Sequence, residues 1–359
     1  MIKIKKNFSL KKYNTFQVNA YAKFFVEVFS SQDILDLIKK PEFQKNKFFI
    51  LWWWANVLFT KNFNWLIIKV SISWKKIIES KWNDILVQSW AWEDWHDFIM
   101  RCIDRNLAWL ENLVLIPWQV WSSAVGNIGA YGSEVKDHIY EIYWINLKTK
   151  KFQKIKKSEC KFGYRDSIFK NKLKNNFIIT DVIFKLWKAD KNYKPNYNYH
   201  DIKKKILEWK INARRITIRQ LADIIIQTRR IKLPDPKKIG TAWSFFKNPI
   251  ISKTKFKILQ KKYPELIWFP SEKNLPNISI SNSESLISNA IKLSAGQLID
   301  LAGFKWFRKW NVWTYQNHAL VLVNHGKATG QEIAKFANQI QKKVLAKFGV
   351  KLEPEVIFI

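Results

Sequence analysis

Two stretches of this chain have the setting of loops that hold a phosphate against the backbone, yet both carry tryptophan where glycine is expected. The first covers residues 51–56 and follows an apolar, strand-like run; the second covers residues 116–132. Backbone N–H groups reach a phosphate only where side chains leave room for it. The predicted contacts in these loops are Trp52, Trp53, Trp54, Ala55, Asn56, Ser122, Ser123, Asn127, Ile128, Gly129 and Gly132.

The composition shows the same exchange of glycine for tryptophan. The 359 residues include 20 Trp and 10 Gly, although average glycine usage of about 7% predicts roughly 25 glycines. We therefore hypothesise that most of the tryptophans are glycine in the native protein. A gene that uses UGA as a glycine codon would give this pattern when UGA is translated as tryptophan. The alternative is a tryptophan-rich aromatic binding surface.

Several other motifs follow in order along the chain. The run Lys161–Ser167 contains Gly-Tyr-Arg-Asp-Ser, the run 232–236 reads Lys-Leu-Pro-Asp-Pro, and the run 244–249 reads Ser-Phe-Phe-Lys-Asn-Pro. The chain then ends with Leu-Glu-Pro-Glu-Val at 352–356. With Trp118 and Trp121 taken as glycine, these motifs and their spacing resemble the UDP-N-acetylenolpyruvoylglucosamine reductase family. The resemblance begins at Asn14-Thr15-Phe16 and covers nearly the whole chain.

The resemblance implies a reductase that uses FAD and NADPH to reduce the vinyl ether of UDP-N-acetylglucosamine enolpyruvate. Arg165 matches the arginine that binds the substrate carboxylate, because a guanidinium can bind a carboxylate with two parallel hydrogen bonds. Pairing of Arg165 with Asp166 is the alternative. Ser244 matches the proton donor, although a Ser-Phe-Phe run by itself also fits ordinary packing. Glu355 matches the third catalytic residue; in a strand, Glu353 would face the same side.

Further positions match substrate contacts of the family. They are Tyr164, Tyr199, Lys232, Asn248, Phe269 and His318. The segment 171–231 and the loop after Asn248 resemble the longer subtype, in which a tyrosine-bearing loop covers the substrate. Phe269 stands at that tyrosine, His318 at a position that is often glutamine, and Ile357 at a common arginine. Trp95 matches a tryptophan of the family and is taken as genuine.

The resemblance also implies an α+β fold. It predicts the FAD-binding fold of the vanillyl-alcohol-oxidase (PCMH) type in two α/β subdomains, with the PCMH-type region at about 16–188, plus a C-terminal α+β substrate domain. The expected domains are residues 1–72, 73–228 and 229–359. Apolar spacing and capping residues predict a helix that is capped within Ser31–Asp33 and runs through Lys40, further helices near 95–105, 218–230 and 327–348, and strands that include 48–51 and 177–180. The Ser- and Asn-rich run 277–289 is expected to be a loop.

Composition limits the remaining possibilities. No apolar run reaches the ~18 residues of a membrane span, and the N-terminus lacks the features of a signal peptide. Only Cys102 and Cys160 occur, without metal-ligand spacing, so we expect a reduced cytoplasmic protein, a monomer with no metal.

A formal charge of +33 invites a nucleic-acid interpretation, but the lysines are scattered and fit a codon bias better than a binding surface. We expect no nucleic-acid or membrane partner. A nucleic-acid-binding protein with a Lys/Trp surface and a flavin oxidase on the same scaffold stay as alternatives.

Overall fold

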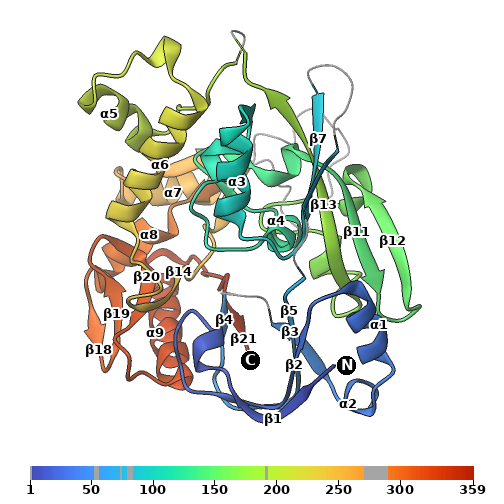
Figure 1. The fold of residues 1–359 in the computed structure, drawn as a ribbon. Coiled ribbons are helices and arrows are strands. Elements are labelled where there is room, and N and C mark those ends of the chain that lie inside the picture. Colours follow the sequence, from blue (N-terminus) through green and yellow to red (C-terminus); the bar gives the residue numbers. More distant parts are fainter. Residues whose placement is uncertain (1, 52–55, 73–74, 79–83, 191–192, 271–289) are drawn as a thin grey trace, which may run out of the picture. The chain divides into compact units, whose positions relative to one another are not determined.

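The computed structural model describes residues 2–51, 56–72, 75–78, 84–190, 193–270 and 290–359 (Figure 1). They form two compact units whose segments alternate along the chain. Unit 1 comprises residues 1–8, 22–54 and 64–230, and unit 2 comprises residues 9–21, 55–63 and 231–359. These two units do not follow the chain in consecutive blocks, so they do not test the three consecutive domains expected from the sequence, which stay a prediction.

The first sheet of unit 1 is built from the N-terminal quarter of the chain. Its strand order is β1 (Ile4–Ser9), β2 (Tyr21–Val28), β5 (Phe63–Val70) and β3 (Phe48–Leu51), with β3 parallel to β5. Helix α1 (Ser31–Ile38) begins at a capping box in which Ser30 and Asp33 bond each other's backbone, and α2 (Pro41–Gln44) follows. The expected helix and the strand 48–51 are confirmed, but the expected cap at Ser31–Asp33 and end at Lys40 were wrong, because the Ser30 side chain bonds Asp33 N and the helix ends at Ile38.

The second sheet of unit 1 is the larger one and is centred on β13. The first eight residues of β13 are all buried, as expected for a strand that is covered on both faces. Helices α3 (Trp95–Asp104) and α4 (Val120–Gly126) pack beside it (Figure 1). The strand order is β12 (Lys151–Lys156), β11 (Ile139–Asn146), β13 (Phe177–Lys188), β7 (Asp84–Trp90) and β6 (Lys75–Ile78), with β8 (Leu107–Ala108) also on β13.

Helix α3 forms where the sequence predicts it because both its start and its apolar face are encoded locally. The Asp94 side chain accepts a hydrogen bond from the backbone N–H of Asp97 and caps the first turn. The buried residues recur at helical spacing, which places them on one face. They are Trp95, Phe98, Ile99, Cys102 and Ile103.

Two helices follow, and the last two residues of the second one belong to unit 2. Helix α5 (His200–Glu208) was not expected, and α6 (Ile218–Lys232) is two residues longer than the helix expected at 218–230. Pro234 disfavours helical backbone only at the residue before it, Leu233, so the helix can continue through Lys232. The prediction that the helix ends before Lys232 was therefore wrong.

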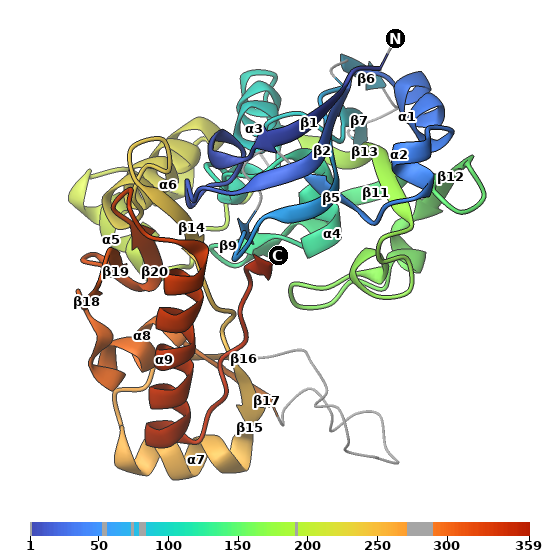
Figure 2. The same cartoon turned by 90° about the horizontal axis from the view of Figure 1, so that it is seen from below.

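The described part of unit 2 consists of small sheets and helices (Figure 2). The main sheet has the order β14 (Gly240–Ser244), β20 (His318–Asn324), β19 (Val312–Tyr315) and β18 (Arg308–Lys309). The second has the order β15 (Ile250–Ser252), β17 (Ala290–Leu293) and β16 (Trp268–Pro270), and β21 (Ile357–Phe358) pairs in parallel with β4 (Val57–Leu58). The helices are α7 (Lys253–Lys262), α8 (Ala295–Ile299) and α9 (Gly330–Phe348).

The remaining short strands, β9 (Gly129–Ala130) and β10 (Ser133–Glu134), form a hairpin in unit 1. In unit 2, α9 confirms the expected C-terminal helix; Thr329 and Glu332 form its capping box, and Gly349 ends it with a left-handed residue.

One backbone and one side-chain hydrogen bond tie the N-terminal loop of unit 2 to its main sheet. Thr241 N donates to Thr15 O at 2.8 Å, and Asn324 Nδ2 donates to Phe16 O at 2.7 Å. Asn14, which is buried, bonds to its own loop at Leu10 and Val18.

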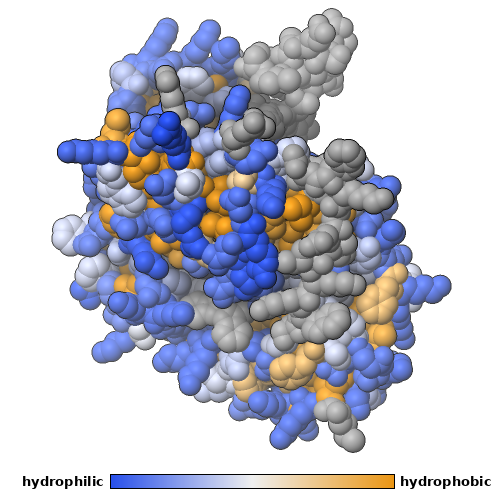
Figure 3. All heavy atoms as spheres, turned by 45° about the horizontal axis from the view of Figure 1, so that its top comes forward, coloured by the Kyte–Doolittle hydropathy of each residue, from blue (hydrophilic) through white to orange (hydrophobic). Residues whose placement is uncertain are grey.

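The surface is rich in polar residues. Hydrophilic side chains cover most of the face in Figure 3, with apolar side chains between them. Among the described residues, no helix combines the length and the apolar composition that crossing a bilayer requires.

Candidate functional site

In unit 1, two sequence segments with expected glycine positions lie side by side. Trp95 N donates to Trp118 O at 2.9 Å, Val120 N to Glu93 O at 3.0 Å, and Trp121 N to Ala91 O at 2.7 Å. Residues 89–95 therefore pair with residues 118–121. The two segments most dependent on small residues thus form one backbone surface.

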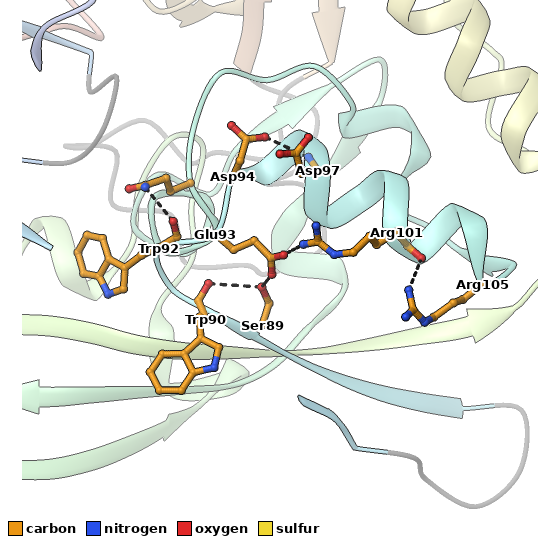
Figure 4. Close-up of polar contacts among 9 residues, drawn as sticks. Ser89, Trp90, Trp92, Glu93, Asp94, Asp97, Arg101 and Arg105 are labelled. Atoms are coloured by element: carbon orange, nitrogen blue, oxygen red, sulfur yellow. Dashed lines mark hydrogen bonds and ion pairs between the residues drawn. The ribbon is translucent and has the colours of Figure 1, made fainter. Parts of the chain in front are cut away.

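A half-buried ion pair holds the first of these segments (Figure 4). The Glu93 carboxylate accepts a hydrogen bond from Ser89 Oγ at 2.7 Å and forms an ion pair with Arg101 of α3. Burial lowers the pKa of Arg101. Because Ser89 lies near the end of β7 and Arg101 lies on α3, Glu93 connects the sheet to the helix through the turn between them.

The segment from Pro117 to Gly132 is not one continuous loop. Residues Val120–Gly126 form α4, and Ser122 Oγ donates to Gln119 O at 2.7 Å within its first turn. Ser123 is fully buried and also donates its hydroxyl to a backbone carbonyl, that of Val120. The expectation of a loop at 120–126 was wrong, because buried Val120, Trp121 and Ala124 give this stretch an apolar face.

Asn127 organises the turn that ends α4. It adopts left-handed backbone (φ 42°), as residues after a helix often do. Its amide nitrogen donates to Glu134 Oε2 at 2.9 Å and to Gly163 O at 2.8 Å, and its Oδ1 accepts from Lys136 N. Asn127 therefore connects the 127–132 turn to the Gly-Tyr-Arg motif, so its side chain is used within the protein.

The residues after Asn127 form the short β9–β10 hairpin. Ala130 pairs with Ser133 across a two-residue loop in which Tyr131 (φ 49°) and Gly132 (φ 79°) are both left-handed, as a type I′ turn requires. Ile128 is buried. The Gly129 carbonyl accepts a hydrogen bond from Arg165 Nη2 at 2.7 Å.

Arg165 lies at the tip of a tight turn with strained backbone. Gly163 and Asp166 exchange both backbone hydrogen bonds, and Arg165 has φ 55°, which is uncommon for a residue other than glycine. Its guanidinium carbon lies 5.4 Å from the centre of the Tyr164 ring. Asp166 accepts from Ser167 N and Asn171 Nδ2 instead of pairing with Arg165, which disfavours the alternative of an Arg165–Asp166 pair.

Two residues near Arg165 were missed in the sequence. Tyr131 lies 5.2 Å from Tyr199 ring to ring, and Arg229 of α6 lies 6.0 Å from the Tyr131 ring and bonds its hydroxyl. Burial lowers the pKa of Arg229, and the charge of Arg165 also contributes. Burial raises the pKa values of both tyrosines. Tyr131 stands within a glycine-rich motif, which was a usable signal, whereas only the fold brings Arg229 to it.

In unit 2, backbone pairing brings Glu355 next to Phe245, the residue that follows Ser244. Ser244 pairs with Val321 of β20, and the next residue, Phe245, accepts a hydrogen bond from Glu355 N at 2.8 Å. The chain at Ser244 therefore runs between β20 and the C-terminal segment. Arg165 belongs to unit 1.

Glu353 and Glu355 have different surroundings. The predicted alternative placed both on one face of a strand, but residues 351–356 are not in a strand. Glu353 is exposed and forms an ion pair with Lys247 at 3.5 Å, while Glu355 is half-buried. Because Glu353 is exposed and paired with Lys247, Glu355 is the better candidate for the third catalytic residue.

The predicted substrate contacts of unit 2 are spread over several elements. Asn248 Oδ1 accepts from Ala295 N at 2.9 Å, and His318 Cε1 would lie 3.0 Å from a Cβ on Gly296, so both meet the start of α8. His318 Nδ1 accepts from Leu320 N. Asn317, beside His318, donates to Ile231 O, which holds the end of α6 at Lys232. Phe269 lies on β16 beneath Lys292 Nζ, at 6.0 Å.

The fit of a flavin dinucleotide is tested best at Asn56. Trp52, Trp53, Trp54 and Ala55 lie outside the described residues, as does 277–289. Asn56 Oδ1 is buried and has no hydrogen-bond partner among the residues that the structure describes, while the Asn56 carbonyl accepts from Ile357 N at 2.8 Å. A buried unpaired acceptor calls for a donor, and a ribityl hydroxyl or a ring N–H of a flavin would supply one. The residues therefore fit the cofactor.

A family model, curated relatives and a solved structure all point to the same family. The family model described as UDP-N-acetylenolpyruvoylglucosamine reductase, C-terminal domain, matches residues 235–359. Proteins named UDP-N-acetylenolpyruvoylglucosamine reductase from Flavobacterium johnsoniae and Bdellovibrio bacteriovorus are 42% and 37% identical, each over 99% of both chains. The crystal structure of the Thermus caldophilus reductase has a TM-score of 0.65 at 18% identity, covering 99% of this chain and all of that one.

The structural match confirms the fold class that the sequence predicted. The full-length identity to the Flavobacterium johnsoniae protein goes further than the fold, because it covers both units of this chain. The chain belongs to the UDP-N-acetylenolpyruvoylglucosamine reductase family of oxidoreductases.

Proposed function

We propose that this chain is an NADPH-dependent flavoenzyme that reduces the enolpyruvyl group of UDP-N-acetylglucosamine enolpyruvate to give UDP-N-acetylmuramate for peptidoglycan synthesis. The observation that carries the proposal is the backbone hydrogen bond from Glu355 N to Phe245 O, which brings Glu355 next to the residue that follows Ser244. Family membership over the full length supports the same reaction. We also expect a monomeric, cytoplasmic enzyme.

Arg165 is proposed to hold the substrate carboxylate. Negative charge develops on that carboxylate when hydride adds to C3, so a fixed cation there stabilises the transition state more than the ground state. The tight Gly163–Asp166 turn and the bond to the Gly129 carbonyl restrict the guanidinium before substrate binds. Preorganisation of this kind removes the cost of ordering the side chain during the reaction.

Ser244 is proposed to donate the proton to C2, and Glu355 to polarise this acid. A serine hydroxyl is a weak acid in water and needs a partner to give up its proton and recover it. Glu355 is joined to the residue after Ser244 through its own backbone N–H. Its half-buried side chain is therefore the one to test as that partner.

FAD and NADPH complete the proposed chemistry. Bound FAD would supply the transfer of hydride from NADPH to C3 of the substrate. The residues proposed to hold it are Asn56, with its buried acceptor, and the backbone of residues 127–132, together with Trp52, Trp53, Trp54, Ala55, Ser122 and Ser123. The Ser123 hydroxyl already bonds within α4, so Ser123 would help by leaving room for the cofactor and not by donating a hydrogen bond to it.

The substrate contacts are proposed from the functional groups that their side chains offer. Tyr199 and Lys232 offer a hydroxyl and a cation for the diphosphate, and Asn248 offers an amide. Phe269 can stack but cannot donate a hydrogen bond. His318 provides a ring nitrogen where family members often carry glutamine, so it can still bond a polar group.

The proposal is tested by separating the two half-reactions. The flavin is reduced with NADPH without oxygen, and the reduced protein is mixed with UDP-N-acetylglucosamine enolpyruvate in a stopped-flow instrument. We expect fast reoxidation with this substrate and none with UDP-N-acetylglucosamine, the control that lacks the enolpyruvyl group. A third arm uses oxygen: reoxidation by oxygen that is faster than by the enolpyruvate would support the flavin oxidase instead.

A further inference from the structure

Four tryptophans of this chain adopt left-handed backbone. Among the described residues, 15 residues other than glycine have positive φ, and Trp109 (95°), Trp243 (58°), Trp306 (48°) and Trp310 (57°) are four of them. Asparagine, which tolerates this region best among such residues, also accounts for four. Tryptophan has a Cβ and a bulky ring, so its intrinsic backbone preferences do not explain why four tryptophans have positive φ.

Glycine occupies the same kind of position elsewhere in the chain. Gly132, Gly303, Gly326 and Gly349 have φ between 62° and 96°. Glycine reaches this region without a Cβ clash and is the usual residue there. The four tryptophans thus share their backbone conformation with the glycines of this protein.

The environment at Trp310 identifies the residue that the turn requires. Lys309 pairs with Val312 across a two-residue loop made of Trp310 and Asn311. Trp310 has positive φ and Asn311 does not, so the loop has the sign pattern of a type II′ turn. That turn places glycine at its first central position, which is the position of Trp310.

Trp243 occupies an equally specific position. The pairing of β14 with β20 shifts register between Thr241 and Ser244, and Trp243 lies in that bulge with left-handed backbone. The common bulge of this kind carries glycine at its left-handed residue. Trp306 follows in a turn and is 63% exposed, and Trp310 is 48% exposed, so neither ring is held by burial.

We propose that residues 109, 243, 306 and 310 are glycine in the functional protein, and that the backbone at these four positions is built for glycine. The inference does not rest on the proposed function, since it uses only backbone conformation and turn type. Trp95 marks the opposite case: it lies within α3, is fully buried, and donates its ring N–H to Leu113 O at 2.9 Å. Position 95 is a genuine tryptophan.

The proposal is tested first by comparing glycine with alanine at the same site. Alanine removes the ring and keeps the Cβ, so the glycine–alanine difference reports backbone conformation alone. We expect Trp306→Gly and Trp310→Gly to melt a few degrees above Trp306→Ala and Trp310→Ala. Controls are Trp65 on β5 and Trp268 on β16, which are also exposed; in strands alanine should equal or exceed glycine. Alanine matching glycine at 306 and 310 would overturn the proposal.

A second measurement does not depend on folding of the recombinant chain. Peptide mass spectrometry of the protein isolated from its native source reads the residue at each position directly. Glycine at 109, 243, 306 and 310 with tryptophan at 95 supports the proposal. Tryptophan at any of the four positions overturns it there, whatever the activity of the protein.

Discussion

At the scale of single residues, Arg165 illustrates how function and strain coincide. It is left-handed without being glycine or asparagine, which costs about 1–3 kcal/mol. The surrounding contacts hold it there: Lys170 Nζ donates to the Arg165 carbonyl at 2.7 Å, and its guanidinium bonds the carbonyls of Asn127 and Gly129. A side chain fixed in this way is suited to a planar, two-pronged contact.

Arg165→Lys tests that contact. Lysine keeps the charge but cannot make two parallel hydrogen bonds to a carboxylate. We expect NADPH to reduce the flavin at nearly the normal rate, and reoxidation by the enolpyruvate substrate to fall strongly. The two rates come from separate stopped-flow experiments on one variant. Normal reoxidation would mean that another group binds the carboxylate, and Arg229 is then the residue to change.

Ser244→Ala tests the proton donor. Flavin reduction by NADPH should be almost unaffected, because no proton at C2 is involved in it. Substrate-driven reoxidation should fall by ~10²–10⁴, the usual contribution of a general acid. Ser244→Cys keeps a transferable proton and should lose less than alanine. If both half-reactions slow equally, Ser244 supports the structure and Glu355→Gln is the next variant.

At the scale of elements, the bulge in β14 determines how Ser244 is presented. The bulge lies between two pairings with β20, and Thr241 Oγ1 accepts from Trp243 N at 3.0 Å within it. A bulge re-aims the side chains that follow it. The left-handed residue at 243 and the side chain at 244 are therefore linked through the same local geometry.

Trp243→Gly and Trp243→Ala test this link. Glycine accepts the left-handed conformation without strain, whereas alanine does not. We expect the glycine variant to reoxidise with substrate faster than the alanine variant, with similar flavin reduction in both. The ring of Trp243 also donates to Pro234 O at 2.9 Å, and both variants lose that bond, so it cancels in the comparison. Equal reoxidation rates would show that the bulge does not position Ser244.

At the scale of the whole molecule, buried titratable groups make stability depend on pH in opposing directions. Burial lowers the pKa of His138 from 6.5 to about 4, with a smaller contribution from Lys157. Burial also raises the pKa values of Glu111 and Asp181. The histidine favours folding at higher pH, while these carboxyl groups oppose the loss of stability in acid.

His138→Gln tests the histidine contribution. Between pH 6.5 and about 4 the unfolded chain binds a proton that native His138 does not, so the free energy of unfolding falls as pH falls. Glutamine does not titrate and removes this slope. We expect the stability of the parent protein relative to the variant to decrease from neutral pH to about 4, measured by urea denaturation. A difference that is constant over this range contradicts a buried neutral histidine.

The sequence by itself determined the local structure and the family. The cap and the apolar spacing of α3, the capping box of α9 and the order of the Gly-Tyr-Arg, Ser-Phe-Phe and C-terminal Glu motifs can all be read without a fold. Helix caps and apolar faces depend on residues three or four positions apart, which a sequence displays directly. The surplus of tryptophan over glycine is equally visible in the composition.

Tertiary structure alone decided which of these residues meet. The approach of Glu355 to the chain at Ser244, the Tyr131–Arg229 contact and the Asn127–Gly163 bond join segments 36 to 111 positions apart. The helical state of 120–126 also depends on packing against β13. Such contacts arise from burial and strand pairing across the chain, and no local pattern specifies them. The left-handed conformation at residues 109, 243, 306 and 310 belongs to the same class, since turn type follows from the strands that the turn connects.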